Sequence, residues 1–264
     1  MFNYWVIFYY FGITYLGDRD SPYPFTKEEM DRYNVDCWRP SVWLAYYRDH
    51  WYYFTAAAFV VGSFLLGFFG QFVDRTRLIL LYNLLALFAH QIEEYILPGG
   101  GGIFINVALY GETTAYDRFP GNKLSSAWVN NLAYPFYISA AVYSDQIWLG
   151  LAQCYFGFVQ VIGHGILMNS RANMGYNPGL ATALLLHLPI GIYYIAHVQD
   201  QGALVMSDWF YGLAGLVGAL LVTIPIPIAA CRDRESPYRM TPAEMNKFNM
   251  LEKFRAKGIL KKDI

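Results

Sequence analysis

The side chains with the greatest chemical potential form a short run inside an apolar stretch. Residues 90–94 read His-Gln-Ile-Glu-Glu and lie in Leu78–Leu97, which we expect to span a membrane as a helix. Side chains three and four positions apart share a helix face, so His90, Glu93 and Glu94 should converge. A divalent metal with imidazole and carboxylate ligands would neutralise the adjacent carboxylates most simply. The alternative is that the helix ends early and leaves the glutamates in water.

A second set of polar residues is predicted at the same depth. Gln160 and His164 are four positions apart near the end of another expected helix, and Asn130 and Asn131 open a third. Because successive helices alternate in direction, these residues and His90 fall in the same half of the bilayer. Polar groups from three helices at one depth indicate a functional site inside the membrane.

These residues predict a site for a divalent metal, either zinc or iron. Two histidines and one glutamate would make the ligand set, and the second glutamate would act as general base or as a further ligand. Asn131 and Gln160 are predicted to orient ligands or to hold a substrate oxygen, and Glu94 is the predicted catalytic carboxylate. The predicted metal ligands are His90, Glu93, Glu94 and His164.

Three other ionisable residues are not predicted to bind the metal. His187 lies near the middle of an apolar segment, where a lone histidine is typical of a hydrogen-bonded core residue. Glu112 and Asp117 belong to the long loop at residues 98–126, which could fold back over the site. Long loops inside a compact chain are often functional or mobile.

The composition places the chain in a membrane. Of its 264 residues, 56% are hydrophobic and only 15% are charged, whereas soluble domains carry about 25% charged residues. The net charge of −1 and the absence of a basic stripe argue against a nucleic-acid partner. The three scattered cysteines exclude a disulfide framework. Membrane lipids are therefore the expected surroundings.

The apolar segments predict an all-α, polytopic transmembrane helix bundle with six core spans. The segment after Arg48, Asp49 and His50 is 23 residues long without a charge, and a bilayer core needs roughly 20. The stretch Met1–Leu16 is short and aromatic and could form a seventh span. The six predicted core spans are Trp51–Val73, Leu78–Leu97, Ala127–Tyr143, Ile147–Met168, Leu180–Val198 and Ala203–Ala230.

The distribution of lysine and arginine predicts the orientation. With six core spans, 17 of these residues fall on the side of both soluble ends and two, Arg75 and Arg77, on the other. Positive residues favour the cytoplasmic side, so both ends are expected there. We predict three regions: residues 1–50 with a cytoplasmic juxtamembrane segment, 51–230 as the bundle, and 231–264 as a basic cytoplasmic helix.

One motif occurs twice. Asp18–Asn34 reappears as Asp233–Asn249, with nine of 17 positions identical. Each copy contains Thr-x-x-Glu, the capping box of a helix N-terminus, and Pro242 would occupy the first helical position of the second copy. We expect short helices leaving the membrane on one side. Alternatively, these segments bind a protein partner.

The ordered set of motifs resembles the family of multi-span membrane proteins named for its HXXEE motif. The resemblance covers roughly residues 78–195. The chain has Gln160 where the family leads us to expect asparagine, which keeps the amide but lengthens its arm. The resemblance supplies positions rather than a reaction, and it rests on His90–Tyr95, Pro98–Gly100, Asn131, His164 and Tyr176–Thr182.

The leading functional hypothesis is a membrane-embedded, metal-dependent enzyme. It would be a hydrolase or a non-haem iron oxygenase that acts on a lipid or isoprenoid-like substrate from the cytoplasmic leaflet. A transporter or ion carrier would instead line both halves of the bundle with polar residues, and the outer halves here are apolar. A structural or accessory subunit of a larger membrane complex would use the repeated segments and aromatic residues for docking. Metal content discriminates between the enzyme and this last alternative.

Overall fold

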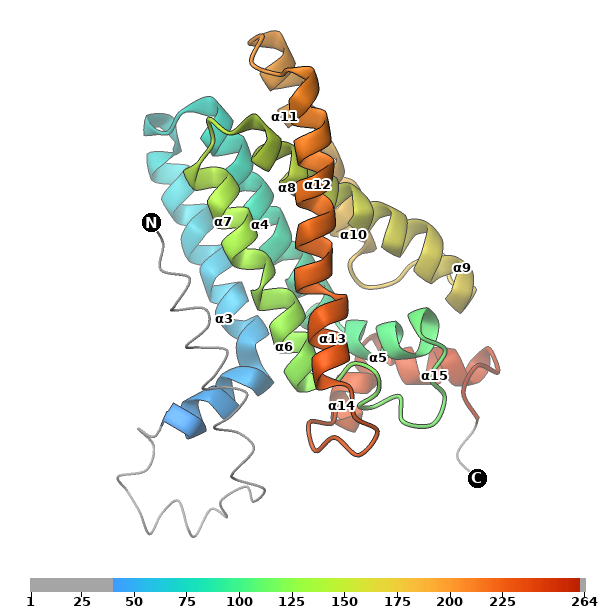
Figure 1. The fold of residues 1–264 in the computed structure, drawn as a ribbon. Helices are drawn as coiled ribbons and strands as arrows, with labels where there is room; N and C mark the ends of the chain where they lie inside the picture. The colour runs from blue at the N-terminus through green and yellow to red at the C-terminus, as the bar shows by residue number, and fades with distance from the viewer. Residues whose placement is uncertain (1–39, 262–264) are drawn as a thin grey trace. The chain divides into compact units, whose positions relative to one another are not determined.

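The computed structural model describes residues 40–261, and these are helical without any strand (Figure 1). The chain divides into two units, Met1–Trp51 and Tyr52–Ile264. Helix α3 (Pro40–Phe69) crosses the boundary between them. The expectations for Met1–Leu16 and for the first repeat copy lie outside the described residues.

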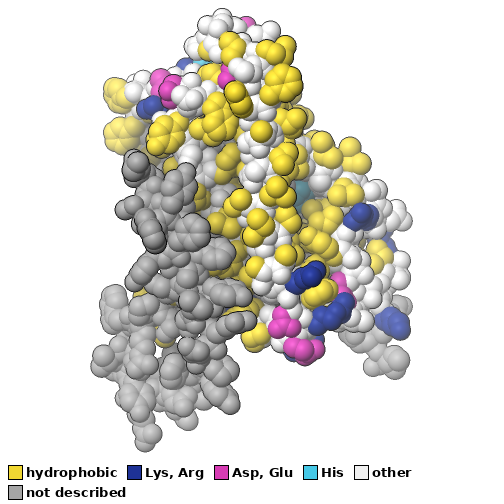
Figure 2. All heavy atoms as spheres, in the orientation of Figure 1, with side chains coloured by type: hydrophobic (Ala, Val, Ile, Leu, Met, Phe, Trp, Pro, Cys, Tyr) yellow, Lys and Arg dark blue, Asp and Glu magenta, His cyan; other side chains and the backbone are white. Residues whose placement is uncertain are grey.

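Four helical stretches are long and apolar enough to cross a membrane, which indicates a membrane protein. Hydrophobic side chains cover much of the face seen in Figure 2, and most of its charged side chains gather toward the two ends. The four stretches are Val42–Phe72, Ile147–Ala172, Leu180–Asp200 and Met206–Cys231. They comprise α3 and η2 (Gly70–Phe72); α8 (Ile147–Ile162), η4 (Gly163–Met168) and α9 (Asn169–Ala172); α10 (Leu180–Thr182), η5 (Ala183–His187) and α11 (Leu188–Asp200); and α12 (Met206–Thr223) and α13 (Pro225–Cys231).

The number of candidate spans is four rather than the predicted six. Helix α4 (Arg75–Tyr95) carries an asparagine, a glutamine, a histidine and two glutamates, which lower its hydropathy. The predicted span Ala127–Tyr143 is divided into α6 (Lys123–Asn131) and α7 (Ala133–Val142). The division precedes Pro135, which lacks the amide hydrogen that a continuous helix would donate to Asn131. Both regions nevertheless pack among the spans, since α4 contacts α7 and α11.

Small residues bring α12 close to α8, its main neighbour. A Cβ atom at Gly212 would lie 2.9 Å from the Leu151 Cβ, and one at Gly215 would lie 3.0 Å from the Ala152 Cβ. Larger side chains at these glycines would push the helices apart. Close backbone approach through small residues is a common way for membrane helices to associate.

The loop predicted at residues 98–126 contains two short helical elements, α5 (Gly101–Phe104) and η3 (Ile105–Leu109). It begins with Gly99 and Gly100, which have φ angles of 77° and 93°, a region that favours glycine. A Cβ atom at Gly100 would also lie 2.9 Å from the Lys247 carbonyl oxygen. The glycine run therefore lets the chain turn sharply beneath α4.

The C-terminal segment packs against this loop. It contains α14 (Pro242–Met245), η6 (Lys247–Asn249) and α15 (Met250–Ala256). The capping box predicted at Thr241 and Glu244 is present, with Pro242 at the first helical position. Phe254 packs against Phe104, and the Lys247 ammonium donates a 2.6 Å hydrogen bond to the Tyr95 carbonyl. This segment therefore forms one hydrophobic core with α5, η3 and the ends of η4 and α9, and the Lys247 hydrogen bond ties it to the end of α4.

Candidate metal centre

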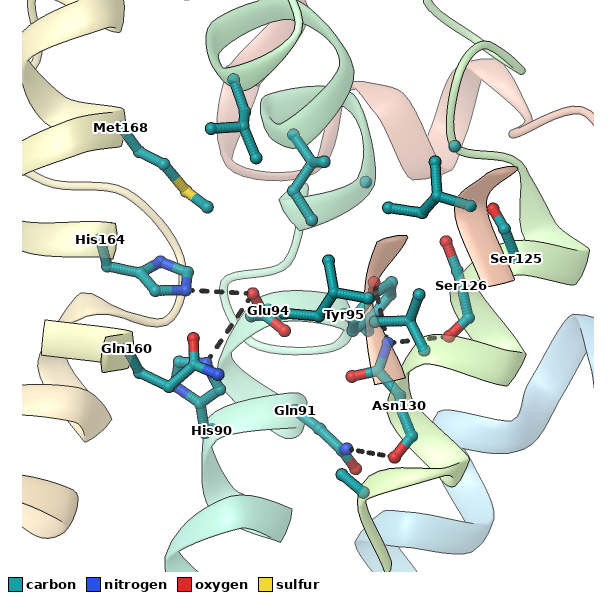
Figure 3. A pocket seen from close by; sticks show the side chains of 18 of the residues that line it. His90, Gln91, Glu94, Tyr95, Ser125, Ser126, Asn130, Gln160, His164 and Met168 are labelled. Atoms are coloured by element: carbon teal, nitrogen blue, oxygen red, sulfur yellow. Dashed lines mark hydrogen bonds and ion pairs between the residues drawn. The ribbon is translucent and has the colours of Figure 1, made fainter. Parts of the chain in front are cut away.

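Three side chains predicted as metal ligands converge in the interior. The Glu94 Oε1 lies 3.4 Å from the His164 Nε2 and 3.9 Å from the His90 Nε2. One potential ligand atom from each residue lies within 4.8 Å of the others, and all three residues are buried. This group could therefore hold a metal ion (Figure 3).

Two elements bring these ligands together. His90 and Glu94 are four residues apart on α4, so they project from one face of that helix. His164 comes from η4, a π-helical stretch that continues α8. Such π-helical segments occur frequently at functional sites, because the wider turn shifts side chains from their regular helical positions.

The ring of His90 is oriented by Thr182. The Thr182 hydroxyl donates its hydrogen to the Glu93 Oε2 at 2.5 Å, and its oxygen lies 3.0 Å from the His90 Nδ1. Because the hydroxyl hydrogen is already donated to Glu93, the hydroxyl oxygen can only accept, and it accepts from the His90 Nδ1–H. This assignment leaves a lone pair on Nε2, which is the atom nearest Glu94.

The ring of His164 is oriented by Asn177. The Asn177 amide nitrogen donates to the His164 carbonyl and to the Asn169 Oδ1, at 2.7 Å each. The Asn177 Oδ1 then accepts from the His164 Nδ1 at 2.6 Å. In the neutral ring, the His164 Nε2 therefore also presents a lone pair to Glu94. Hydrogen bonds to the remote nitrogen are typical of histidines that bind metals.

Three electron-pair donors thus face one another in a buried place. Two neutral imidazole nitrogens and a carboxylate oxygen have no hydrogen to share among them in this tautomeric state. A divalent cation would satisfy all three at once, and imidazole and carboxylate are suitable ligands for zinc and iron. The donor set therefore fits a metal.

Glu93 lies apart from this group, although the sequence placed it among the ligands. Its Oε1 accepts from the Ala181 amide at 3.0 Å and from the Tyr176 hydroxyl at 2.7 Å. Its Oε2 accepts from both the amide and the hydroxyl of Thr182. Glu93 therefore caps the N-terminus of α10, where the helical stretch that continues into α11 begins and a negative charge is favoured.

Gly179 allows the two histidine rings to approach the backbone. Its φ angle is 106°, a region that disfavours other residues. A Cβ atom there would collide with the His164 ring and would lie 2.8 Å from the His90 Cε1. The turn at Asn177-Pro178-Gly179 therefore shapes the site directly.

A cavity of about 130 Å³ adjoins the ligand group. In Figure 3 the sticks of His164 and Gln160 lie on one side of it, those of Asn130 and Ser126 lie on the other, and Glu94 stands between them. Asn131 is absent from the lining residues, and its amide donates to the Ala127 carbonyl at 2.6 Å. The structure thus places Gln160 and Asn130, rather than Asn131, at the cavity.

His187 is a buried, hydrogen-bonded residue, as expected. Its Nδ1 lies 2.8 Å from the Asn83 Oδ1, and the Asn83 amide donates to Gln153. Its ring centroid is 5.7 Å from that of His90. His187, Asn83 and Gln153 therefore form a buried polar network that contacts the ligand group through the His187 and His90 rings. The sequence pattern contains no signal that singles out Asn83 and Gln153.

The two acidic residues of the long loop do not line the cavity. Asp117 pairs with Arg118, and Glu112 accepts from the Arg234 guanidinium at 2.7 Å. Burial alone would raise the pKa of Glu112, but hydrogen bonds from Thr114 and Ala115 and the pairing with Arg234 lower it to about 2. Glu112 therefore attaches the C-terminal segment to the loop.

The described part of the chain is thus an all-helical protein of membrane type with a buried two-histidine, one-carboxylate group. Residues 81–194 match the model of a family described as "Protein of unknown function with HXXEE motif". This match confirms the family resemblance seen in the sequence, and it includes all three converging residues. No curated protein and no solved structure matches the chain.

Proposed function

We propose that the protein is a membrane-embedded, metal-dependent enzyme that acts on a lipid or isoprenoid-like substrate from the cytoplasmic leaflet. The observation that carries the proposal is the convergence of His90, Glu94 and His164 beside a cavity. Hydrogen bonds fix both histidine rings before any ligand arrives. Such preorganisation is typical of a functional metal site.

The cavity offers polar groups for a substrate oxygen. Gln160 lines it beside the histidines, and the Asn130 amide lies opposite, 3.2 Å from the Tyr95 hydroxyl. Asn130 takes the role that the sequence assigned to Asn131. We assign Gln160 and Asn130 to binding and orienting a hydroxyl or carbonyl group of the substrate next to the metal ligands.

The number of carboxylates favours oxidation over hydrolysis. Among the described residues that line the cavity, Glu94 is the one carboxylate. The oxygens of Glu93 are occupied by α10 and Tyr176, so Glu93 is poorly placed to act as a general base. A two-histidine, one-carboxylate triad is complete for a non-haem iron oxygenase. Iron would supply redox chemistry at this site, whereas zinc would supply Lewis acidity.

The lipid substrate follows from the surroundings of the cavity. Its walls include α8 and α13, which belong to two of the candidate spans. We propose that α4, α6 and α7 also lie in the membrane, which restores the six-segment topology. The end of the molecule that carries the C-terminal segment would then face the cytoplasm, in agreement with its many positive residues.

The test uses detergent-purified protein loaded with iron(II) or with zinc(II) and incubated with a total membrane lipid extract. We expect oxygen uptake with iron and lipid products that are heavier by both atoms of dioxygen in mass spectra, a reaction that balances without an added reductant, and we expect both signals to be lost in Glu94→Gln. Lipid hydrolysis by the zinc form alone would overturn the preference for oxidation. Failure to bind either metal would overturn the enzyme proposal.

A further inference from the structure

We infer that the cavity receives the reacting end of a single apolar chain, which enters sideways from the membrane past Ile224 and Ile228. The inference rests on the proposed function and adds the substrate's shape and its route. It concerns the junction of α12 and α13, which takes no part in the metal site.

The last candidate span bends at this junction. Ile224 has φ and ψ angles of −114° and −75°, outside the usual helical range, and Pro225 follows it. Proline lacks an amide hydrogen and commonly kinks a helix. Helix α12 packs along α8, whereas α13 packs against α6. The kink therefore turns the end of the span away from α8 at the level of the cavity.

The residues at the kink line the cavity with apolar surface. Ile224 and Ile228 are four positions apart, so they share the face of α13 that meets the cavity. Ile226, between them, is 53% exposed and points away. Helix α13 alone thus forms this wall: one face of the helix lines the cavity, and the opposite face is exposed and apolar.

Other sides of the cavity are covered by protein. The C-terminal segment packs behind α5 and η3, where Met240 lies so close to Gly102 that an added Cβ atom would be 2.6 Å from its sulfur. On the metal side, α10 is fastened to α4 through Glu93. The exposed apolar residues Ile162 and Ile166 lie between the cavity-lining positions of α8 and η4, so they project from the opposite, outer face of that stretch. Because the kink turns α13 away from α8, the route of an apolar chain into the cavity lies between these two helices.

The size and the polarity of the cavity determine the kind of occupant. About 130 Å³ is well below the roughly 300–1,000 Å³ of pockets that enclose a whole drug-sized ligand. Only the end of a long molecule fits, and the remainder must stay among the lipids. The cavity lining combines the polar side chains of Glu94, Gln160 and Asn130 with apolar side chains such as those of Phe156 and Ile228. This arrangement suits a slender chain that carries one oxygen function near its reacting end.

Photolabelling tests this inference without requiring turnover. The purified protein in detergent is irradiated with a long-chain fatty alcohol that carries a diazirine near the hydroxyl end, and the adducts are mapped by mass spectrometry. We expect adducts on cavity-lining residues such as Phe156 and Ile228, and we expect unlabelled fatty alcohol to compete with them. Adducts confined to exposed membrane-facing residues would overturn the inference.

A matched pair of variants controls for folding and for the metal site. Ile228→Trp should fill the cavity and reduce cavity labelling several-fold, whereas Ile226→Trp, on the outer face of the same helix, should leave labelling unchanged. Both should retain the parent's thermal unfolding temperature and metal content. Equal labelling in the two variants would contradict the proposed route. A parent without metal but with cavity labelling would refute the enzyme function and leave the chain-binding site standing.

Discussion

Glu93 and Thr182 are joined twice, because the Glu93 Oε2 accepts from both the Thr182 amide at 2.7 Å and the Thr182 hydroxyl at 2.5 Å. The same hydroxyl contacts the His90 Nδ1. The first glutamate of the motif therefore orients the histidine through a residue 89 positions away in the chain. The two adjacent glutamates therefore have different roles. Glu94 is a member of the ligand group, and Glu93 holds His90 in position through Thr182.

The fastening role of Glu93 predicts a loss of stability on substitution. Glu93→Gln keeps the size of the side chain but turns an amide donor toward groups that are themselves donors. Hydrogen bonds to a charged group contribute about 1.5–3 kcal/mol each, so a clear fall in the thermal unfolding temperature in detergent is expected. Glu93→Asp, which retains the charge, should lose less. Unchanged unfolding of Glu93→Gln would show that the contacts with α10 are dispensable.

The residues behind the histidines should tune metal affinity. Asn177→Ala and Thr182→Val each remove the partner of one Nδ1 atom and leave all three proposed ligands in place. Loss of such partners typically lowers metal affinity about 10–100-fold. Competition against a chelator of known affinity measures this change. Thr182→Ser keeps the hydroxyl and serves as the control, and an affinity reduced as much as in Thr182→Val would rule out the hydrogen bond as the cause.

Removal of the Tyr137 hydroxyl is predicted to preserve or increase the stability of the protein, rather than to lower it. This hydroxyl is buried and makes no hydrogen bond with any residue that the structure describes. An unsatisfied buried polar group costs about 1–3 kcal/mol, so Tyr137→Phe should unfold at the same temperature or at a higher one. Tyr194→Phe is the comparison, because the Tyr194 hydroxyl donates to the Ile147 carbonyl and its removal should destabilise. A destabilised Tyr137→Phe would reveal a partner such as an ordered water.

Acid should loosen the C-terminal segment through Glu112. The folded state lowers the pKa of this carboxyl from 4.5 to about 2, so its contribution to stability is complete above pH 4.5 and disappears as the pH falls toward 2. The protection of residues 232–261 against hydrogen exchange, taken relative to the intrinsic exchange rate at each pH, should fall across that range. Glu112→Gln should exchange faster near neutral pH and respond less to acid. An identical acid response in parent and variant would assign the effect to other carboxylates.

The sequence was informative where spacing or composition determines the outcome. The spacing of His90 and Glu94 was enough to place them on one face of α4, and the depth of His164 was enough to bring it near them. Charge and hydropathy indicated helices in a membrane, but only four of the six predicted spans are long and apolar enough, because α4 is polar and a proline interrupts α6 and α7. The sequence predicted both neighbouring glutamates as metal ligands and could not separate their roles, since the contacts of Glu93 come from α10 and from Tyr176. Helix spacing alone also left Asn130 and Asn131 equivalent.

The most direct test of the account is metal stoichiometry in a pair of isosteric variants. Parent protein, Glu94→Gln and Glu93→Gln are purified in detergent, exposed to iron(II) or zinc(II), desalted and analysed for bound metal. The account predicts one metal per chain in the parent and in Glu93→Gln, and none in Glu94→Gln. Metal retained in Glu94→Gln and lost in Glu93→Gln would contradict it, as would a parent that binds no metal.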